Sequence, residues 1–373
     1  MNLEATPYTG TLVASLGFLL AFVFGAVAQR THFCTLGAVS DWINIGDLSR
    51  MRMWLLAIAV AMLAANGLQA AGLIDLGKSI YVAPNLMWLS HVVGGLLFGI
   101  GMTLGSGCGS KTLIRIGAGN LKSVVVAVFL GLSAWMTLRG LFGQWRVDWL
   151  QPVAVNFERW SIPGQDLPTL LSGARASPGL ALACAAALAA AICAFVFGSR
   201  DFRGNREGML GGLVVGLVVA AGWFVTANLG YRENPDTLEL TFYATNSRAA
   251  ESFSFVAPVA YTLELLTMWT DRSLRITFGI AAVVGMVAGA FAMAKATGTF
   301  RWESFTSPAD MRNHMLGGVL MGVGGVAALG CTIGQGITGL STLALGSFIT
   351  FASIVAGCAA TMKYQYWRMM RED

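Results

Sequence analysis

The chain has 373 residues, of which 55% are hydrophobic and only 12% are charged, and its formal net charge is +5. A soluble protein carries about 25% charged residues, whereas the mean hydropathy here is +0.66, so composition excludes an ordinary soluble domain. The excess of basic residues does not indicate nucleic-acid binding, because these residues lie in short segments between long apolar runs. About 20 apolar residues cross a bilayer as a helix. The sequence therefore predicts an all-α polytopic membrane protein that binds no nucleic acid.

Apolar runs of membrane-spanning length recur along the whole chain, and we treat residues 1–373 as a single membrane domain. The first run is preceded by Glu4 and by no Lys or Arg, so the basic segment of a cleavable signal peptide is missing. We expect about nine transmembrane helices. They are predicted at residues 11–28, 53–74, 88–105, 121–138, 178–198, 208–228, 275–295, 314–330 and 341–361.

The distribution of Lys and Arg predicts the orientation of these spans. With the N-terminus outside, the inner segments carry 15 Lys and Arg residues, and the longer outer segments carry 9. Cytoplasmic segments carry the excess of basic residues in membrane proteins. We therefore expect a multi-pass protein of the bacterial inner membrane, with its N-terminus outside and its C-terminus in the cytoplasm.

An internal repeat relates the two ends of the chain. Residues 91–108 (HVVGGLLFGIGMTLGSGC) align with residues 314–331 (HMLGGVLMGVGGVAALGC), with eight of 18 positions identical, including the terminal cysteine. A fainter match sets residues 31–39 over 251–259 and pairs Cys34 with Ser254. We predict repeats at 8–140 and 205–365, joined by a linking transmembrane helix at 175–200. One linking helix inverts the second repeat, which is the plan of many secondary transporters.

Four segments interrupt the apolar runs, at residues 30–44, 105–120, 252–261 and 330–341. Non-helical backbone at membrane depth is tolerated only inside protein or along an aqueous path, so we expect a short re-entrant helix after each break. Cys34, Cys108, Ser254 and Cys331 lie near the expected starts of these helices. A helix N-terminus attracts anions, and a thiol adds a soft sulfur with a weak S–H donor. These features predict a site for an anion that carries a terminal sulfur.

Other residues around the breaks are candidates for substrate contact. Gly107, Gly109 and Gly330 would let the main chain approach closely. Lys111 and Arg115, with Thr112 between them, either set topology or draw the anion onward. Gln335 and Thr338 could donate hydrogen bonds to an oxyanion, and His32 could tune Cys34. Arg30 either contacts substrate or pairs with Asp41.

The remaining cysteines, Cys184, Cys193 and Cys358, lie inside apolar runs and are expected to be small core or lipid-facing residues. The sequence contains no C-x-x-C pair, and its three histidines have no metal-ligand spacing. We therefore expect no metal and no cofactor.

Four motifs in this chain resemble those of the YeeE/YedE family, the sulphur-transport-domain permeases: QRTHFCTLGAVSD, GIGMTLGSGCGSKTLIRIGAGNLKS, AGAFAMAKATGTFR and GGVLMGVGGVAALGCTIGQGITG. The resemblance implies a pseudo-symmetric hourglass of nine spans and three cysteines that pass thiosulfate along by S–H contacts. Carried over by motif, these are Cys34, Cys108 and Cys331. The chain departs from the family pattern in GSGCGSKT, in AALGC and at Ser254, where some relatives have cysteine.

The expected function is import of thiosulfate or a related sulfur anion, with Cys331 and Cys34 engaging the anion and Cys108 handing it inward. The alternatives are a permease for selenium or another sulfur species, or a membrane thiol protein that forms a cysteine persulfide. We expect no enzymatic activity. The expected partners are the small inorganic anion and the lipid bilayer, with a cytoplasmic sulfur-carrier or sulfurtransferase protein as a further candidate.

Overall fold

The computed structural model describes residues 7–235 and 237–372, and most of them are helical. The α-helices are α1 (Pro7–Arg30), α2 (Thr35–Asn44), α3 (Ser49–Ala70), α4 (Trp88–Leu104), α5 (Gly109–Gly117), α6 (Leu121–Arg139), α7 (Leu141–Trp145), α8 (Leu167–Ser172), α9 (Pro178–Phe197), α10 (Arg200–Gly204), α11 (Arg206–Phe224), α12 (Ala257–Thr267), α13 (Phe278–Ala296), α14 (Pro308–Ala327) and α15 (Leu345–Glu372). The other elements are the 3-10 turns η1 (Leu76–Lys78) and η3 (Phe157–Trp160), the π-helical turns η2 (Arg146–Leu150), η4 (Val225–Leu229) and η5 (Gly334–Gly339), and the strands β1 (Asn85–Leu86), β2 (Val155–Asn156), β3 (Tyr231–Glu233) and β4 (Leu240–Phe242).

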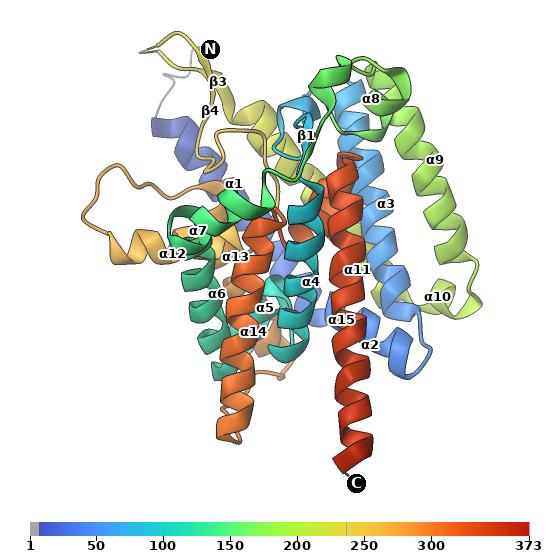
Figure 1. Ribbon diagram of the computed structural model, residues 1–373, viewed down its shortest axis with the longest axis vertical. Helices are drawn as coiled ribbons and strands as arrows, with labels where there is room; N and C mark the ends of the chain where they lie inside the picture. The colour runs from blue at the N-terminus through green and yellow to red at the C-terminus, as the bar shows by residue number, and fades with distance from the viewer. Residues whose placement is uncertain (1–6, 236, 373) are drawn as a thin grey trace.

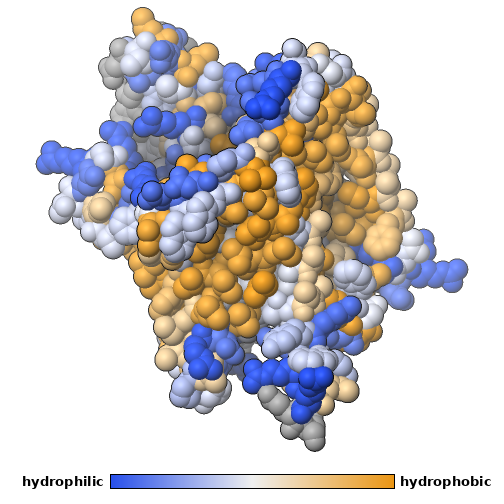
Figure 2. Space-filling model, viewed as in Figure 1, coloured by the Kyte–Doolittle hydropathy of each residue, from blue (hydrophilic) through white to orange (hydrophobic). Residues whose placement is uncertain are grey.

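A broad apolar belt crosses the middle of the face shown in Figure 2, and charged side chains gather at the two ends of the molecule. In the described part of the chain, eight segments are long and apolar enough to cross a membrane. These segments are Tyr8–Asn44, Ser49–Ala70, Trp88–Gly117, Leu121–Arg139, Pro178–Phe197, Arg206–Leu229, Phe278–Ala296 and Leu345–Arg371. The prediction of an all-α polytopic membrane protein is confirmed.

The remaining predicted span corresponds to α14, which has 20 residues but is not among the eight. Asp310 and Arg312 lie in its first turns and reduce its hydropathy. The helix packs against α4 and α6, and its glycines and His314 are buried. It is therefore a helix enclosed largely by protein, which needs less apolar surface than a lipid-facing span.

Glycines bring the long helices into close contact. An added Cβ at Gly101 of α4 would lie 2.7 Å from the nitrogen of Met321 and 2.8 Å from the oxygen of Gly317 in α14. Further along the same contact, an added Cβ at Gly94 would lie 2.7 Å from the oxygen of Gly324. The two helices are thus antiparallel, and small residues let their backbones touch.

The start of α1 and the end of α15 lie at opposite ends of the molecule (Figure 1). The antiparallel pairs β1–β2 and β3–β4 lie at the same end as the start of α1, and α10 lies towards the opposite end. The short helices α2 and α5 follow directly after breaks at the ends of α1 and α4.

Candidate functional site

Three long helices end in the same way. Each is followed by a residue other than glycine in the left-handed region, a conformation that costs about 1–2 kcal/mol for an L-residue. These residues are His32 after α1 (φ 53°), Ser106 after α4 (φ 56°) and Leu329 after α14 (φ 59°). Each lies two positions before one of the cysteines Cys34, Cys108 and Cys331.

A main-chain hydrogen bond closes each of these helix ends, from an N–H to the carbonyl five residues earlier. This is the bond of a Schellman motif, which satisfies a carbonyl at the end of a helix. The three bonds are Phe33 N to Ala28 O at 3.1 Å, Gly107 N to Met102 O at 2.9 Å, and Gly330 N to Gly325 O at 2.7 Å. The three breaks are therefore repeated structural features, placed where the sequence predicts them.

Each cysteine lies at the start of the helical segment that follows its break. The sulfur of Cys34 accepts the N–H of Gly37 at 3.4 Å and caps α2. The sulfur of Cys331 accepts the N–H of Gly334 at the same distance. Cys108 is the N-cap residue of α5, and its sulfur lies 3.3 Å from the hydroxyl oxygen of Ser110. The thiols are thus held beside the N–H groups of helix starts, which favour anions.

Ser254 does not repeat this geometry, although the sequence places it near the start of a re-entrant helix. It lies in an extended segment, and α12 begins three residues later after Val256, which makes no side-chain cap. The segment instead runs past the third break. The N–H of Phe255 bonds to the sulfur of Cys331, and an added Cβ at Gly334 would lie 2.6 Å from the hydroxyl oxygen of Ser254.

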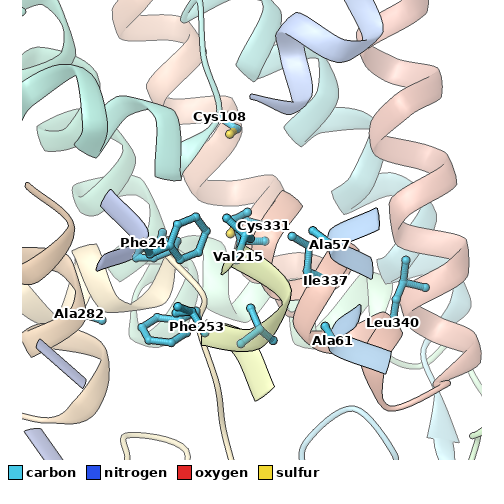
Figure 3. Close-up of a cluster of buried hydrophobic side chains, with 14 of the residues drawn as sticks. Phe24, Ala57, Ala61, Cys108, Val215, Phe253, Ala282, Cys331, Ile337 and Leu340 are labelled. Carbon is cyan, nitrogen blue, oxygen red and sulfur yellow. The ribbon is translucent and has the colours of Figure 1, made fainter. Parts of the chain in front are cut away.

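The three thiols are buried close together. Cys34, Cys108 and Cys331 are 8%, 1% and 0% exposed. Cys108 lies within electrostatic range of both other cysteines. Figure 3 shows Cys108 and Cys331 in one buried cluster with Phe24 and Phe253. Cys108 is therefore the central member of the trio.

Candidate glycines beside the thiols lie at tight contacts. An added Cβ at Gly109 would lie 3.6 Å from the oxygen of Phe255, so α5 meets the extended segment. At Gly107, an added Cβ would lie 3.3 Å from Cγ of Lys111, and at Gly330 it would lie 3.1 Å from Cγ of Gln335. Side chains at Gly107 and Gly330 would disturb the immediate surroundings of Cys108 and Cys331, whereas one at Gly109 would make an ordinary van der Waals contact.

A cavity of about 560 Å³ opens beside α5, at the end where this helix and the loop before α14 meet. Its lining includes His32 and the basic residues Lys111, Arg115 and Arg301, together with one acid, Glu303, which pairs with Arg301. Lys111 is close enough to Cys34 and Cys108 to interact with both thiols electrostatically. Arg115 donates a hydrogen bond to the main-chain oxygen of Ser106 at 2.8 Å. The cavity therefore has more basic than acidic side chains in its lining.

The candidate hydrogen-bond donors near the thiols are already engaged. Gln335 donates to the oxygen of Ala328 at 2.6 Å, and Thr338 donates to the oxygen of Phe253 at 2.7 Å. Thr112 donates to the oxygen of Cys108 at 3.0 Å. These side chains hold the backbone around the thiols, and donation by Gln335 and Thr338 to an oxyanion stays a prediction.

Arg30 has a different partner from the one considered in the sequence. Its side chain reaches Glu207 at 3.5 Å on the surface, while Asp41 pairs with Arg50 at 3.2 Å. An Arg30–Asp41 ion pair is therefore wrong. The partners come from α11 and α3, and local spacing gives no signal for either.

Two further residues lie near the three thiols, Tyr81 and Cys358, and no pattern in the sequence predicts that they do so. Tyr81 is 6% exposed, packs edge-on against Trp223 and lies within electrostatic range of Cys331. Cys358 is a buried core residue, as expected, but Thr103 donates to its sulfur at 3.4 Å, and it lies within range of Cys34 and Cys108. Across residues 7–235 and 237–372, no group of three or more His, Cys, Asp or Glu side chains could hold a metal.

Comparison of the sequence with models of known protein families gives a match that covers all three breaks. The family model described as Sulphur transport matches residues 30–360, which include all three breaks. The chain belongs to the sulphur-transport family. Among its relatives, the thiosulfate transporter TsuA of Spirochaeta thermophila is 28% identical over 91% of this chain and 96% of the relative. The thiosulfate transporter TsuA of Escherichia coli K12 is 24% identical over 95% of this chain and 96% of the relative.

As a member of the sulphur-transport family with eight long apolar helices, the protein is a multi-pass membrane protein. The family and both relatives are described as transporters.

Proposed function

We propose that this protein is an inner-membrane permease that imports thiosulfate past Cys331, Cys108 and Cys34. The observation that carries the proposal is the shared geometry of the three breaks, each of which sets a buried thiol at a helix start. The thiosulfate transporters among its relatives support the choice of substrate.

The chemistry of the buried thiols suits this substrate. Thiosulfate has a terminal sulfur, which accepts the weak S–H donor of a neutral thiol, and three oxygens, which accept stronger N–H donors. Neutral thiols favour passage because thiolates would repel the dianion. The main-chain N–H groups at the helix starts attract the oxygens without adding a fixed charge.

The directions of the helices give the order of the thiols along the path. With the start of α1 outside, α1 and α4 end towards the cytoplasm and α14 ends towards the outside. Cys331 would then meet the anion first, followed by Cys108 and Cys34. This proposed order differs from the expectation that Cys34 engages the anion together with Cys331, and the proximity of Cys34 to Cys108 and Lys111 supports it.

Two inverted repeats, 8–140 and 205–365, would account for this arrangement. The antiparallel contact of α4 and α14 supports this proposal, because these helices contain the aligned segments 91–108 and 314–331. Linked by α9, the repeats would have their cysteine breaks on opposite sides of the membrane centre.

The basic cavity beside Lys111 is the proposed inner exit. Its positive charge would hold a dianion after release from Cys34. A cytoplasmic sulfur-carrier or sulfurtransferase protein would collect the anion at this cavity.

Growth tests the proposed function. Cells that lack their sulfate and thiosulfate importers, with thiosulfate as sole sulfur source, should grow when this chain is produced and should fail with an empty vector. Uptake of radiolabelled thiosulfate should persist in excess sulfate, which lacks a terminal sulfur. Absence of growth with the protein in the membrane would contradict the proposal, and stronger inhibition by selenite or selenosulfate than by unlabelled thiosulfate would favour a selenium substrate.

A further inference from the structure

The outer approach to Cys331 contains an acidic side chain, in contrast to the basic inner cavity. Glu251 begins the extended segment that leads to the thiol, and its side chain is partly buried. Its main chain is fixed by Thr226, whose hydroxyl accepts the Glu251 N–H at 3.2 Å and donates to the Glu251 carbonyl. The carboxylate accepts the hydroxyl of Ser247 at 2.7 Å. The side chain is therefore held in place and is not free to turn into solvent.

Glu251 is close to both an outer hollow and the segment that contacts the first thiol. Four residues further along the segment, the N–H of Phe255 bonds to the sulfur of Cys331, and Tyr81 lies within electrostatic range of both Glu251 and Cys331. On the other side, a cavity of about 200 Å³ is lined by Lys78 and Ala227. Ala227 follows Thr226, and the carbonyl of Lys78 accepts the N–H of Ala250 at 3.2 Å. The hollow, Glu251 and Cys331 are thus linked by short main-chain contacts on the same side of the molecule.

Glu251 has no basic partner among the residues that the structure describes. Tyr81 and Tyr261 are the titratable groups that face it from neighbouring elements, and η4 contributes the uncharged Thr226. The ammonium of Lys78 donates to the hydroxyl oxygen of Tyr231 at 3.0 Å, and Arg248 is exposed. Six other carboxylates do form ion pairs: Asp41, Asp75, Glu207, Glu264, Glu303 and Asp310.

Burial raises the pKa of Glu251 to about 7, although hydrogen bonds from Ser247 and from the Asn246 N–H act to lower it. The carboxyl group is therefore mostly neutral below about pH 7 and mostly charged above it. A carboxylate at this position would repel an arriving dianion, whereas a carboxylic acid could donate an O–H to it.

We propose that Glu251 is the proton-accepting gate of the uptake path, so that the anion moves from the outer hollow to Cys331 only when this carboxyl group is protonated. The step is a proton transfer from hydronium in the external solution to the carboxylate: an O–H bond of hydronium breaks, an O–H bond of the carboxyl group forms, and water is left. Thiosulfate itself remains a dianion near neutral pH, so the pH dependence would belong to the protein. This inference rests on the proposed function.

The test is initial thiosulfate uptake into proteoliposomes as a function of external pH. For a group with a pKa near 7, the protonated fraction falls about tenfold between about pH 6 and about pH 8, and wild-type uptake should fall by the same factor. Glu251→Gln is permanently neutral and should import at both pH values with less than about a twofold difference. Ser247→Ala removes a hydrogen bond that lowers the pKa, so it should move the midpoint to higher pH.

Glu233→Gln is the matched control, because Glu233 is an exposed acid on β3 at the same end of the molecule. It should keep the wild-type pH profile. A flat wild-type profile would overturn the inference, as would a Glu251→Gln profile that follows wild type. Loss of uptake at every pH in folded Glu251→Gln protein, with activity retained in Glu251→Asp, would also overturn it. Wild-type uptake at about pH 6 establishes the proposed function separately from these outcomes.

Discussion

Trp54 of α3 supports two of the three breaks, and its removal gives a prediction with a definite magnitude. Its indole is 1% exposed and stacks between Phe33, with ring centroids 5.7 Å apart, and Phe351, at 5.2 Å. An added Cβ at Gly336 in η5 would lie 2.7 Å from Cη2 of the indole. Since Phe33 precedes Cys34 and η5 follows Cys331, one side chain packs against both segments.

Trp54→Ala removes about 140 Å³ of side chain, which at about 24 cal/mol per Å³ of unfilled cavity costs about 3 kcal/mol. The two stacked ring contacts add about 0.5–1.5 kcal/mol each, so we expect a total loss of about 4–6 kcal/mol if the cavity does not collapse. The indole N–H has no hydrogen-bond partner, so the cost does not include a lost hydrogen bond. Trp54→Phe should therefore cost much less.

The assay is the temperature at which purified protein in detergent loses its monodisperse size-exclusion peak. Trp54→Ala should lower this temperature strongly and Trp54→Phe only slightly. Trp269→Ala is the control, because Trp269 is 68% exposed and should have little effect. Equal temperatures for Trp54→Ala and Trp269→Ala would refute the packing argument.

Two further substitutions test the helix contacts and the inner cavity. Gly289→Ala places a Cβ 1.9 Å from the oxygen of Phe22 at the contact of α1 and α13, so it should destabilise the protein by about 1–3 kcal/mol in the same thermal assay. Gly179→Ala is the control and should not destabilise the protein, because an added Cβ there meets nothing within 4 Å. Equal stability of the two variants would show that α1 and α13 can separate without cost. Lys111→Gln removes a cavity cation that interacts electrostatically with Cys34 and Cys108. It should reduce initial thiosulfate uptake about tenfold, a change of about 1.4 kcal/mol, whereas the exposed Lys363→Gln variant should keep wild-type uptake. Equal uptake rates for these two variants would contradict a role for the cavity.

Apolar length and glycine–cysteine pairs predicted the bundle and the breaks because both are local features of the chain. The positions of Cys34, Cys108 and Cys331 at the starts of short helices follow from the same local pattern. The left-handed residues His32 and Leu329 could not be predicted in this way, because that conformation usually selects glycine or asparagine.

Contacts between segments that are far apart in the chain could not be predicted from the sequence. Ser254 lies in an extended segment because its neighbours bond to η5 and Cys331, not because of its own propensity. The donors of Gln335 and Thr338 are taken by carbonyls that only the folded chain brings near. Glu251 looks like an ordinary outer-loop acid until Thr226 and Ser247 fix its position.

The most direct test of the thiol path is initial thiosulfate uptake by single cysteine variants in proteoliposomes, with protein amount and monodispersity matched. Cys331→Ala, Cys108→Ala and Cys34→Ala should each lose at least about tenfold in rate, equivalent to about 1.4 kcal/mol or more. The half-buried Cys184 and Cys193 of α9 lie outside the trio, and their alanine variants should import at the wild-type rate. Equal uptake by all five variants would contradict a path that depends on the three buried thiols.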